Sequence, residues 1–230
     1  MLNKTQTQTQ ITKYIKNGFH IHLIHAALQH ITNNTFLSAT ICIKLYSINY
    51  FYWYGDLYTY LPNPRHNWLK QFIRFTDTGH IASFGYYFFP KLIPLQLAHN
   101  VHFIIMVGYW VGKLIFDLKD ADRIDSSSSS TDIIEWHTDV CTYIHHTVPY
   151  MLIVYELWSY PSIEIVNNNN TLIYTYGWIY SWFFCIYLPW RFYTGDTVYS
   201  ILDQKQTSCQ VMLGFIGVIH IIPVFLSLFV

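Results

Sequence analysis

Long apolar runs, with few charges inside them, constrain the fold of this chain more than any other feature. Five runs are clear, each close to the ~20 residues that an α-helix needs to cross a lipid bilayer. They cover Phe72–Phe89, His99–Phe116, Cys141–Tyr160, Leu172–Trp190 and Val211–Val230. A sixth, Phe36–Tyr54, is weaker because Lys44 and Asn49 interrupt it. The runs lack strict apolar–polar alternation, so they predict helices rather than strands.

The composition favours a membrane environment. Only 11% of the 230 residues are charged, against about 25% in an ordinary soluble domain. Aromatic residues make up 19%, including 20 Tyr and 8 Trp, which suit the two membrane interfaces. The sequence therefore predicts an all-α protein, an integral membrane helical bundle with five or six transmembrane helices, of which we favour six.

The domain organisation follows from the same runs. Residues 1–35 form an N-terminal tail, and residues 36–230 form a single transmembrane helical domain, because no linker interrupts them. Within the tail, Ile11–Ile31 carries four histidines among apolar residues. This stretch fits an interfacial amphipathic helix, and it equally fits the first membrane span.

Charge, cysteines and motifs exclude several classes of protein. Thirteen basic residues balance thirteen acidic ones, so the chain lacks the positive charge that attracts nucleic acid. The four cysteines form no CxxC pair, which argues against a disulfide scaffold and a zinc module. The motifs GxSxG, GxxxxGK[ST] and GxGxxG do not occur, which excludes hydrolases and nucleotide enzymes that depend on them.

Histidines raise the question of a metal or a haem. A di-iron centre needs repeated histidine boxes, and no repeated HxxHH set occurs. Haem ligation by two histidines stays open as a weaker reading, because four histidines lie in different runs. They are His80, His102, His146 and His220. No spacing requires such a group, and we expect neither a metal nor a cofactor.

Polar residues inside the apolar runs mark candidate sites, because they are costly in lipid. Thr76, His80 and Ser83 are spaced i, i+4 and i+7, so they share one face of a helix. In the run from Cys141, His146 shares a polar stripe with Tyr143. The alternative is that these side chains only satisfy one another inside a bundle.

Four short segments carry a resemblance to a known family through their order and spacing. They are Lys70-Gln-Phe-Ile-Arg-Phe-Thr76 followed by Tyr86-Tyr87, His146-Thr147 followed by a proline and Glu156, Tyr160-Pro161, and Thr194-Gly195-Asp-Thr-Val198-Tyr199. On these segments the chain resembles the androgen-induced protein family, which includes the androgen-dependent tissue factor pathway inhibitor regulator. The resemblance covers residues 36–230.

The resemblance implies a multi-span membrane threonine hydrolase that acts on fatty acid esters of hydroxy fatty acids. It places the nucleophile at Thr76 and the catalytic histidine at His146. A second register would place Arg74 at the nucleophile position, but only the first register also matches Tyr86-Tyr87. Where the family has a histidine three residues before the catalytic one, this chain has Tyr143.

The chemistry of these residue types agrees with that assignment. A threonine hydroxyl is a weak nucleophile that needs an adjacent base, and a neutral His146 can take its proton and return it to the leaving alcohol. Candidate residues for binding the substrate or the oxyanion are His80, Tyr143 and Arg191, and the sequence does not choose among them. Glu156 lies ten residues from His146, about 15 Å along a helix, so it is expected to contact a neighbouring helix instead.

Two functions follow as hypotheses. The first is a membrane-embedded hydrolase whose partners are membrane lipid and a lipid-ester substrate. It is expected in the endomembrane system, where the endoplasmic reticulum is the favoured organelle and the sequence does not choose among organelles. The second is a non-catalytic integral membrane protein, such as a lipid-binding or complex-forming subunit. The first requires that Thr76 and His146 approach each other.

Overall fold

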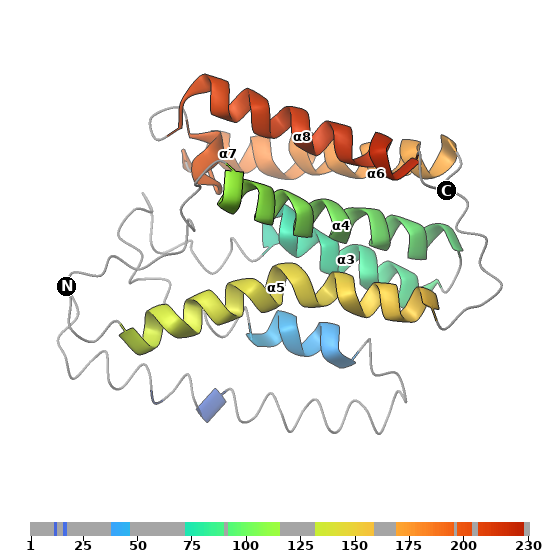
Figure 1. Ribbon diagram of the computed structural model, residues 1–230, viewed down its shortest axis with the longest axis horizontal. Coiled ribbons are helices and arrows are strands. Elements are labelled where there is room, and N and C mark those ends of the chain that lie inside the picture. The colour runs from blue at the N-terminus through green and yellow to red at the C-terminus, as the bar shows by residue number, and fades with distance from the viewer. Residues whose placement is uncertain are drawn as a thin grey trace. The chain divides into compact units, whose positions relative to one another are not determined.

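The computed structural model describes residues 12, 16–17, 38–46, 72–89, 92–115, 132–158, 169–195, 197–203 and 207–227. Its main helices are α3 (Phe75–Phe88), α4 (Leu92–Ile115), α5 (Asp132–Trp158), α6 (Asn169–Trp182), α7 (Leu188–Thr194) and α8 (Cys209–Ser227) (Figure 1). A π-helical turn, η3 (Phe183–Tyr187), joins α6 to α7, and a 3-10 turn, η4 (Ser200–Leu202), precedes α8. No strand occurs in these ranges, which confirms the predicted all-α class there.

Each predicted run corresponds to helix in the structure. Phe72–Phe89 contains α3, His99–Phe116 falls largely in α4, and Leu172–Trp190 extends from α6 through η3 into α7. The weaker run Phe36–Tyr54 is helical at residues 38–46. The prediction for Ile11–Ile31 lies outside the described residues, apart from residues 12 and 16–17, which are helical.

The prediction of a membrane-spanning bundle is wrong. Among the helices of the described ranges, none combines the length with the apolar character that a membrane crossing requires. This finding contradicts the five or six transmembrane helices, the multi-pass membrane class and the location in the endoplasmic reticulum.

The lengths and polar residues of the helices differ from what the apolar runs predicted. α3 has 14 residues, too few for a bilayer, and α6 has 14 before the chain enters the π-helical turn η3. α4 has 24 residues and α5 has 27, but α4 carries His99, Asn100 and His102, and α5 begins with an aspartate and carries further charges. α8 is the most apolar of these helices, and its 19 residues include His220 and Pro223.

The chain divides into two compact units. One comprises residues 1–72 and 122–145, and the other comprises residues 73–121 and 146–230. In the first unit, the Lys44 ammonium lies 5.3 Å from the centre of the Phe72 ring. The second unit contains both Thr76 and His146.

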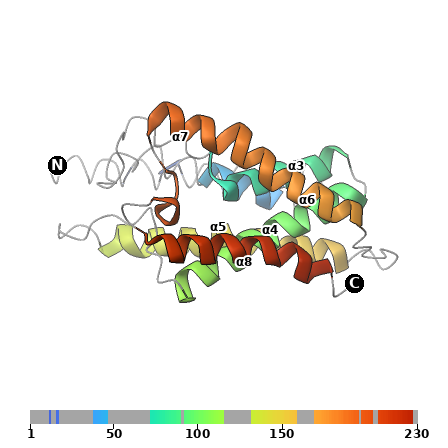
Figure 2. The same ribbon diagram turned by 90° about the horizontal axis from the view of Figure 1, so that it is seen from above.

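α4 is the central helix of the second unit, where it contacts α3, α6 and α8 (Figures 1 and 2). Aliphatic residues along α4 are almost fully buried, among them Leu95, Val101 and Ile104. Ile104 packs in one apolar cluster with Ile179 of α6 and Ile222 of α8. Because a fully buried aliphatic side chain contributes about 1.5–3 kcal/mol, this cluster holds the three helices together.

Two glycines let helices approach α4 closely. A Cβ at Gly79 of α3 would lie 2.6 Å from Ile105 Cδ1 and 3.0 Å from His102 Cε1, both on α4. A Cβ at Gly108 of α4 would lie 2.8 Å from Ile219 Cδ1 of α8. Any larger residue at either position would therefore push two helices apart or displace their side chains.

The segment after α6 turns the chain back toward the start of α3. In the π-helical turn η3, the Leu188 amide bonds the carbonyl of Phe183, directly before Pro189, whose nitrogen cannot donate. α7 ends at Gly195, which has a φ of 73°, a conformation that glycine adopts without strain. The following residues pack Val198 against Trp182 and Tyr187.

Candidate functional site

Thr76 and His146 lie opposite each other, as the hydrolase hypothesis requires. Thr76 is the second residue of α3, and its Oγ1 lies 3.3 Å from Nε2 of His146 in α5. Thr76 is 5% exposed, while His146 is only partly buried. A hydroxyl at this distance can pass its proton to the ring nitrogen. The catalytic role of the pair stays a prediction.

Side chains of α4 fix the plane of the His146 ring. The Tyr109 ring stacks on it, with ring centres 4.1 Å apart and an interplanar angle of 15°. Lys113, one turn further along α4, donates a hydrogen bond of 3.4 Å to the Tyr109 hydroxyl. Trp110 Nε1 donates to Thr147 Oγ1 at 3.3 Å. These contacts orient the imidazole before any substrate arrives.

Tyr199 contacts Thr76 from another part of the chain. Its hydroxyl oxygen accepts a 3.4 Å hydrogen bond from the Thr76 backbone amide. Amides in the first turn of a helix have no partner within the helix, and the N-cap residue of α3, Arg74, makes no side-chain capping bond. Tyr199 therefore satisfies the amide of the candidate nucleophile.

The environment keeps the Tyr199 phenol protonated. Burial raises the pKa of Tyr199, and this outweighs hydrogen bonding to Thr76 and the charge of Arg74, which lower it. An unperturbed tyrosine already titrates near pH 10. Tyr199 thus retains its O–H proton at neutral pH.

Sequence reasoning did not assign a role to Tyr199 or to Tyr109. For Tyr199 a signal existed, because it ends the segment Thr194–Tyr199 that contributes to the family resemblance. Its backbone is unusual as well: the Tyr199 amide bonds the carbonyl of Thr197 at 2.6 Å, across Val198 with a φ of 61°. This tight turn is the rare, strained form for a β-branched residue. For Tyr109 the sequence offered no signal.

The three candidates for substrate or oxyanion binding lie in different places. His80 is 1% exposed and meets the His102 ring edge-on, with centres 5.7 Å apart. Tyr143 lies in α5, one helical turn before His146. Arg191 of α7 donates to the Tyr187 hydroxyl at 3.1 Å and to the Leu202 carbonyl at 3.2 Å. Their roles stay predictions.

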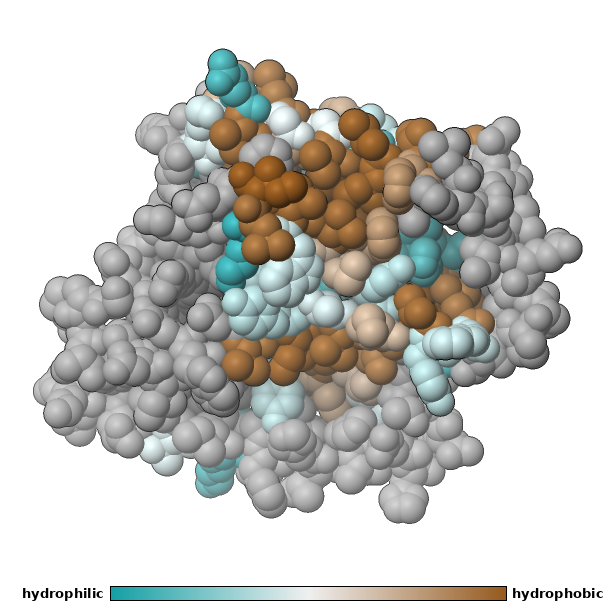
Figure 3. Space-filling view, in the orientation of Figure 1, coloured by the Kyte–Doolittle hydropathy of each residue, from teal (hydrophilic) through white to brown (hydrophobic). Residues whose placement is uncertain are grey.

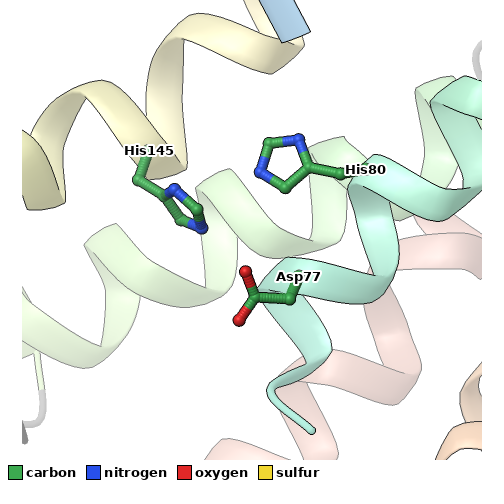
Figure 4. Close-up of side chains that lie close together, drawn as sticks. All are labelled: Asp77, His80 and His145. Atoms are coloured by element: carbon green, nitrogen blue, oxygen red, sulfur yellow. The ribbon is translucent and has the colours of Figure 1, made fainter. Parts of the chain in front are cut away.

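Two buried groups on α3 lie beside this site. Asp77 and His80 project from α3 at neighbouring positions (Figure 4), and a carboxylate oxygen of Asp77 lies within 4.8 Å of a ring nitrogen of His80. Both side chains are 1% exposed. Asp77 also lies in the first turn of α3, where a negative charge is favoured by the helix dipole.

Glu156 contacts a neighbouring helix, as its distance from His146 led us to expect. Its Oε1 accepts a 3.3 Å hydrogen bond from the hydroxyl of Tyr86 in α3. The bond connects the end of α5 to the end of α3. Glu156 thus helps to align the two helices that carry Thr76 and His146.

Comparison of the chain with protein-family models, with curated proteins and with solved structures finds no match. The resemblance to the androgen-induced protein family therefore stays a prediction that rests on the four short segments. The functional proposal therefore rests mainly on the geometry of the site.

Proposed function

We propose that the protein is an ester hydrolase in which Thr76 is the nucleophile and His146 is the general base. The single observation that carries this proposal is the 3.3 Å contact between Thr76 Oγ1 and His146 Nε2. The stack of Tyr109 on His146 supports it, because a base must hold one orientation throughout the reaction. This arrangement activates a hydroxyl that is otherwise a weak nucleophile.

The reaction has two halves. Thr76 Oγ1 bonds to the acyl carbon as its proton passes to His146, and the carbonyl electron pair moves onto oxygen. When that pair returns, the bond to the alcohol oxygen breaks and the alcohol leaves with the proton from His146. Water then attacks the acyl-threonine and gives a proton to His146, which returns it to Thr76 as the acid departs.

We further propose that the substrate is an ester of a long-chain fatty acid. Apolar side chains are exposed on the two helices that carry the pair, Ile81 on α3 and Met151 on α5, and on α8 of the same unit, including Leu213, Ile221 and Phe225. Figure 3 shows apolar residues gathered in the upper part of the view, where α8 lies in Figure 1. Such a surface favours an apolar acyl chain over a polar substrate. The family resemblance points to the same class.

One observation favours the alternative, a protein in which these groups only stabilise the fold. Similar contacts between a hydroxyl and an imidazole occur elsewhere: Ser83 Oγ lies 2.9 Å from His102 Nε2, and the Tyr180 hydroxyl lies 3.1 Å from His220 Nε2. Ser83 and His102, however, are each 1% exposed, so no substrate can reach them. The partial exposure of His146 distinguishes the Thr76 pair from that one.

Covalent labelling tests the proposal. A long-chain alkyl fluorophosphonate should phosphonylate Thr76, and mass spectrometry of peptides should locate the adduct. Thr76→Ala should abolish labelling. His146→Gln should reduce it by a similar factor, because a nucleophile and its base act as a unit.

Ser83→Ala is the matched control. It also removes a histidine-bonded hydroxyl from α3, but one that is sealed from solvent. Its labelling should equal that of the wild type. Circular dichroism should show the same helical content in all variants. Equal labelling of the wild type and folded Thr76→Ala would favour the non-catalytic alternative.

A further inference from the structure

The proposed reaction still lacks an oxyanion donor, and the Tyr199 hydroxyl lies beside the nucleophile. The transition state needs a donor for the negative charge that develops on the substrate oxygen. That oxygen is two bonds away from Thr76 Oγ1 once the acyl carbon has bonded to it. The donor must therefore lie beside Thr76 and on a different side from His146.

Tyr199 meets this requirement by its position. Its oxygen accepts from the Thr76 amide at 3.4 Å, which holds the phenol next to the nucleophile. A phenol oxygen that accepts one hydrogen bond still has its own proton to donate. His146 reaches Thr76 from α5, whereas Tyr199 reaches it from residues 197–203. The two groups thus have separate tasks: one takes a proton and the other donates a hydrogen bond.

The segment that carries Tyr199 is held firmly. The Leu202 amide bonds the Tyr199 carbonyl at 3.0 Å, and Arg191 donates to the Leu202 carbonyl at 3.2 Å. The Tyr199 ring packs edge-on against Trp182, with ring centres 6.3 Å apart. A donor that is fixed before the reaction needs no reorganisation when the charge develops.

We propose that Tyr199 is the oxyanion donor of this site, the group that stabilises the negative oxygen when Thr76 attacks an ester. This inference rests on the proposed hydrolase function. It adds a residue that neither the polar pattern of the sequence nor the carried-over family positions assign to the chemistry. The raised pKa of the Tyr199 phenol supports it, because only the protonated form can donate.

Tyr199→Phe removes the hydroxyl and keeps the ring that packs on Trp182. With p-nitrophenyl decanoate as substrate, kcat should fall by about 10²–10³-fold, the usual effect of losing one oxyanion donor, while KM changes less than about twofold. Labelling by the fluorophosphonate should still occur at Thr76, but more slowly.

Tyr176→Phe is the matched control. It also removes one tyrosine hydroxyl and keeps the ring, but this hydroxyl donates to the His220 carbonyl of α8 at 2.6 Å, so its loss leaves the contacts of Thr76 and His146 in place. Its kcat should stay within about twofold of wild type. If Tyr199→Phe also kept wild-type kcat, the inference would be wrong while the proposed hydrolase function stood. If wild-type protein were not labelled at all, the proposed function itself would fail.

A second variant covers the case in which Tyr199→Phe does not fold. Replacing Tyr199 with 3-fluorotyrosine preserves both the ring and the hydroxyl but makes the phenol more acidic. Deprotonation removes the donor, so the loss of kcat at alkaline pH should begin at lower pH than in the wild type. An unchanged alkaline limb would contradict the proposal, because a purely structural hydroxyl has no reason to link kcat to its own proton.

Discussion

At the scale of single residues, His99 shows how a polar side chain is accommodated in the core. The Tyr150 hydroxyl lies 3.3 Å from its Nε2, and its Nδ1 lies 3.1 Å from Asn100 Oδ1. Asn100 Nδ2 in turn donates to Thr175 Oγ1 at 3.0 Å. All these bonds are satisfied when Nδ1 of His99 carries the proton and Nε2 accepts. Burial of the ring favours this neutral form, because it lowers the pKa of His99.

The neutral state of His99 makes the stability of the fold depend on pH. Burial lowers the pKa of His99 below its usual value of 6.5, and the bond to Asn100 opposes this in part. Between the folded and the unfolded pKa, the unfolded chain binds more protons, so the free energy of unfolding rises with pH. This contribution is present above about pH 6.5 and is lost as the pH falls through the window below it.

Thermal unfolding between pH 7.5 and pH 5 measures this effect. The melting temperature of the wild type should fall on acidification, and His99→Gln should show a shallower fall. Taking the difference between the two proteins removes contributions from the other histidines. Identical slopes would show that His99 does not titrate differently in the folded and unfolded states.

Two residues of the candidate site could be predicted from the sequence, and two others could not. Thr76 and His146 were found because each lies in an apolar run and matches a family segment. Tyr199 and Tyr109 were not predicted, because their contacts with Thr76 and His146 form only in the folded chain. Tyr199 lies 123 residues from Thr76 in the sequence. Only packing brings such residues together, and no local spacing predicts it.

At the scale of helices, the contact between α3 and α4 depends on one missing side chain. Gly79→Ala would place a methyl group 2.6 Å from Ile105 Cδ1 and 3.0 Å from the His102 ring. The Ile105 methyl can move aside, but the His102 ring is held by Ser83. We expect a loss of about 1–3 kcal/mol in the free energy of unfolding, measured by urea denaturation.

Gly85→Ala is the control, because Gly85 lies in the same helix and a Cβ there meets nothing within 4 Å. Alanine favours helix over glycine by about 0.5–1 kcal/mol, so this variant should be more stable than wild type. Opposite signs for the two substitutions would assign the cost at Gly79 to packing. A stabilising Gly79→Ala would show that α3 and α4 can separate freely.

Helix positions were predicted better than helix ends. Each apolar run was found as helix because burial of its apolar face is a local property of the sequence. The start of the run expected at Cys141–Tyr160 was too late, since α5 already begins at Asp132. The π-helical turn at Phe183–Tyr187 was not predicted either, because it depends on how α6 packs and not on residue type alone.

At the scale of the molecule, low charge led us to expect membrane-spanning helices, which the described ranges do not contain. The 11% of charged residues understates polarity, because uncharged polar residues and histidines interrupt the helices. In α3, Thr76, Thr78, His80 and Ser83 are all buried, and the three hydroxyl groups form hydrogen bonds within the protein. The polarity of each helix, and not the charge of the chain, decides whether it can lie in lipid.

Trp182 gives the site an optical readout. Its indole donates to the Ile73 carbonyl at 2.7 Å. Its ring contacts Phe75, which precedes Thr76, and Tyr199, whose hydroxyl accepts from the Thr76 amide. Indole emission shifts to longer wavelengths as the surroundings become more polar. Occupancy of the site should therefore change that part of the tryptophan fluorescence which Trp182→Phe removes. A titration with a decyl ether, which has no carbonyl carbon for Thr76 to attack, would follow binding without any chemical step.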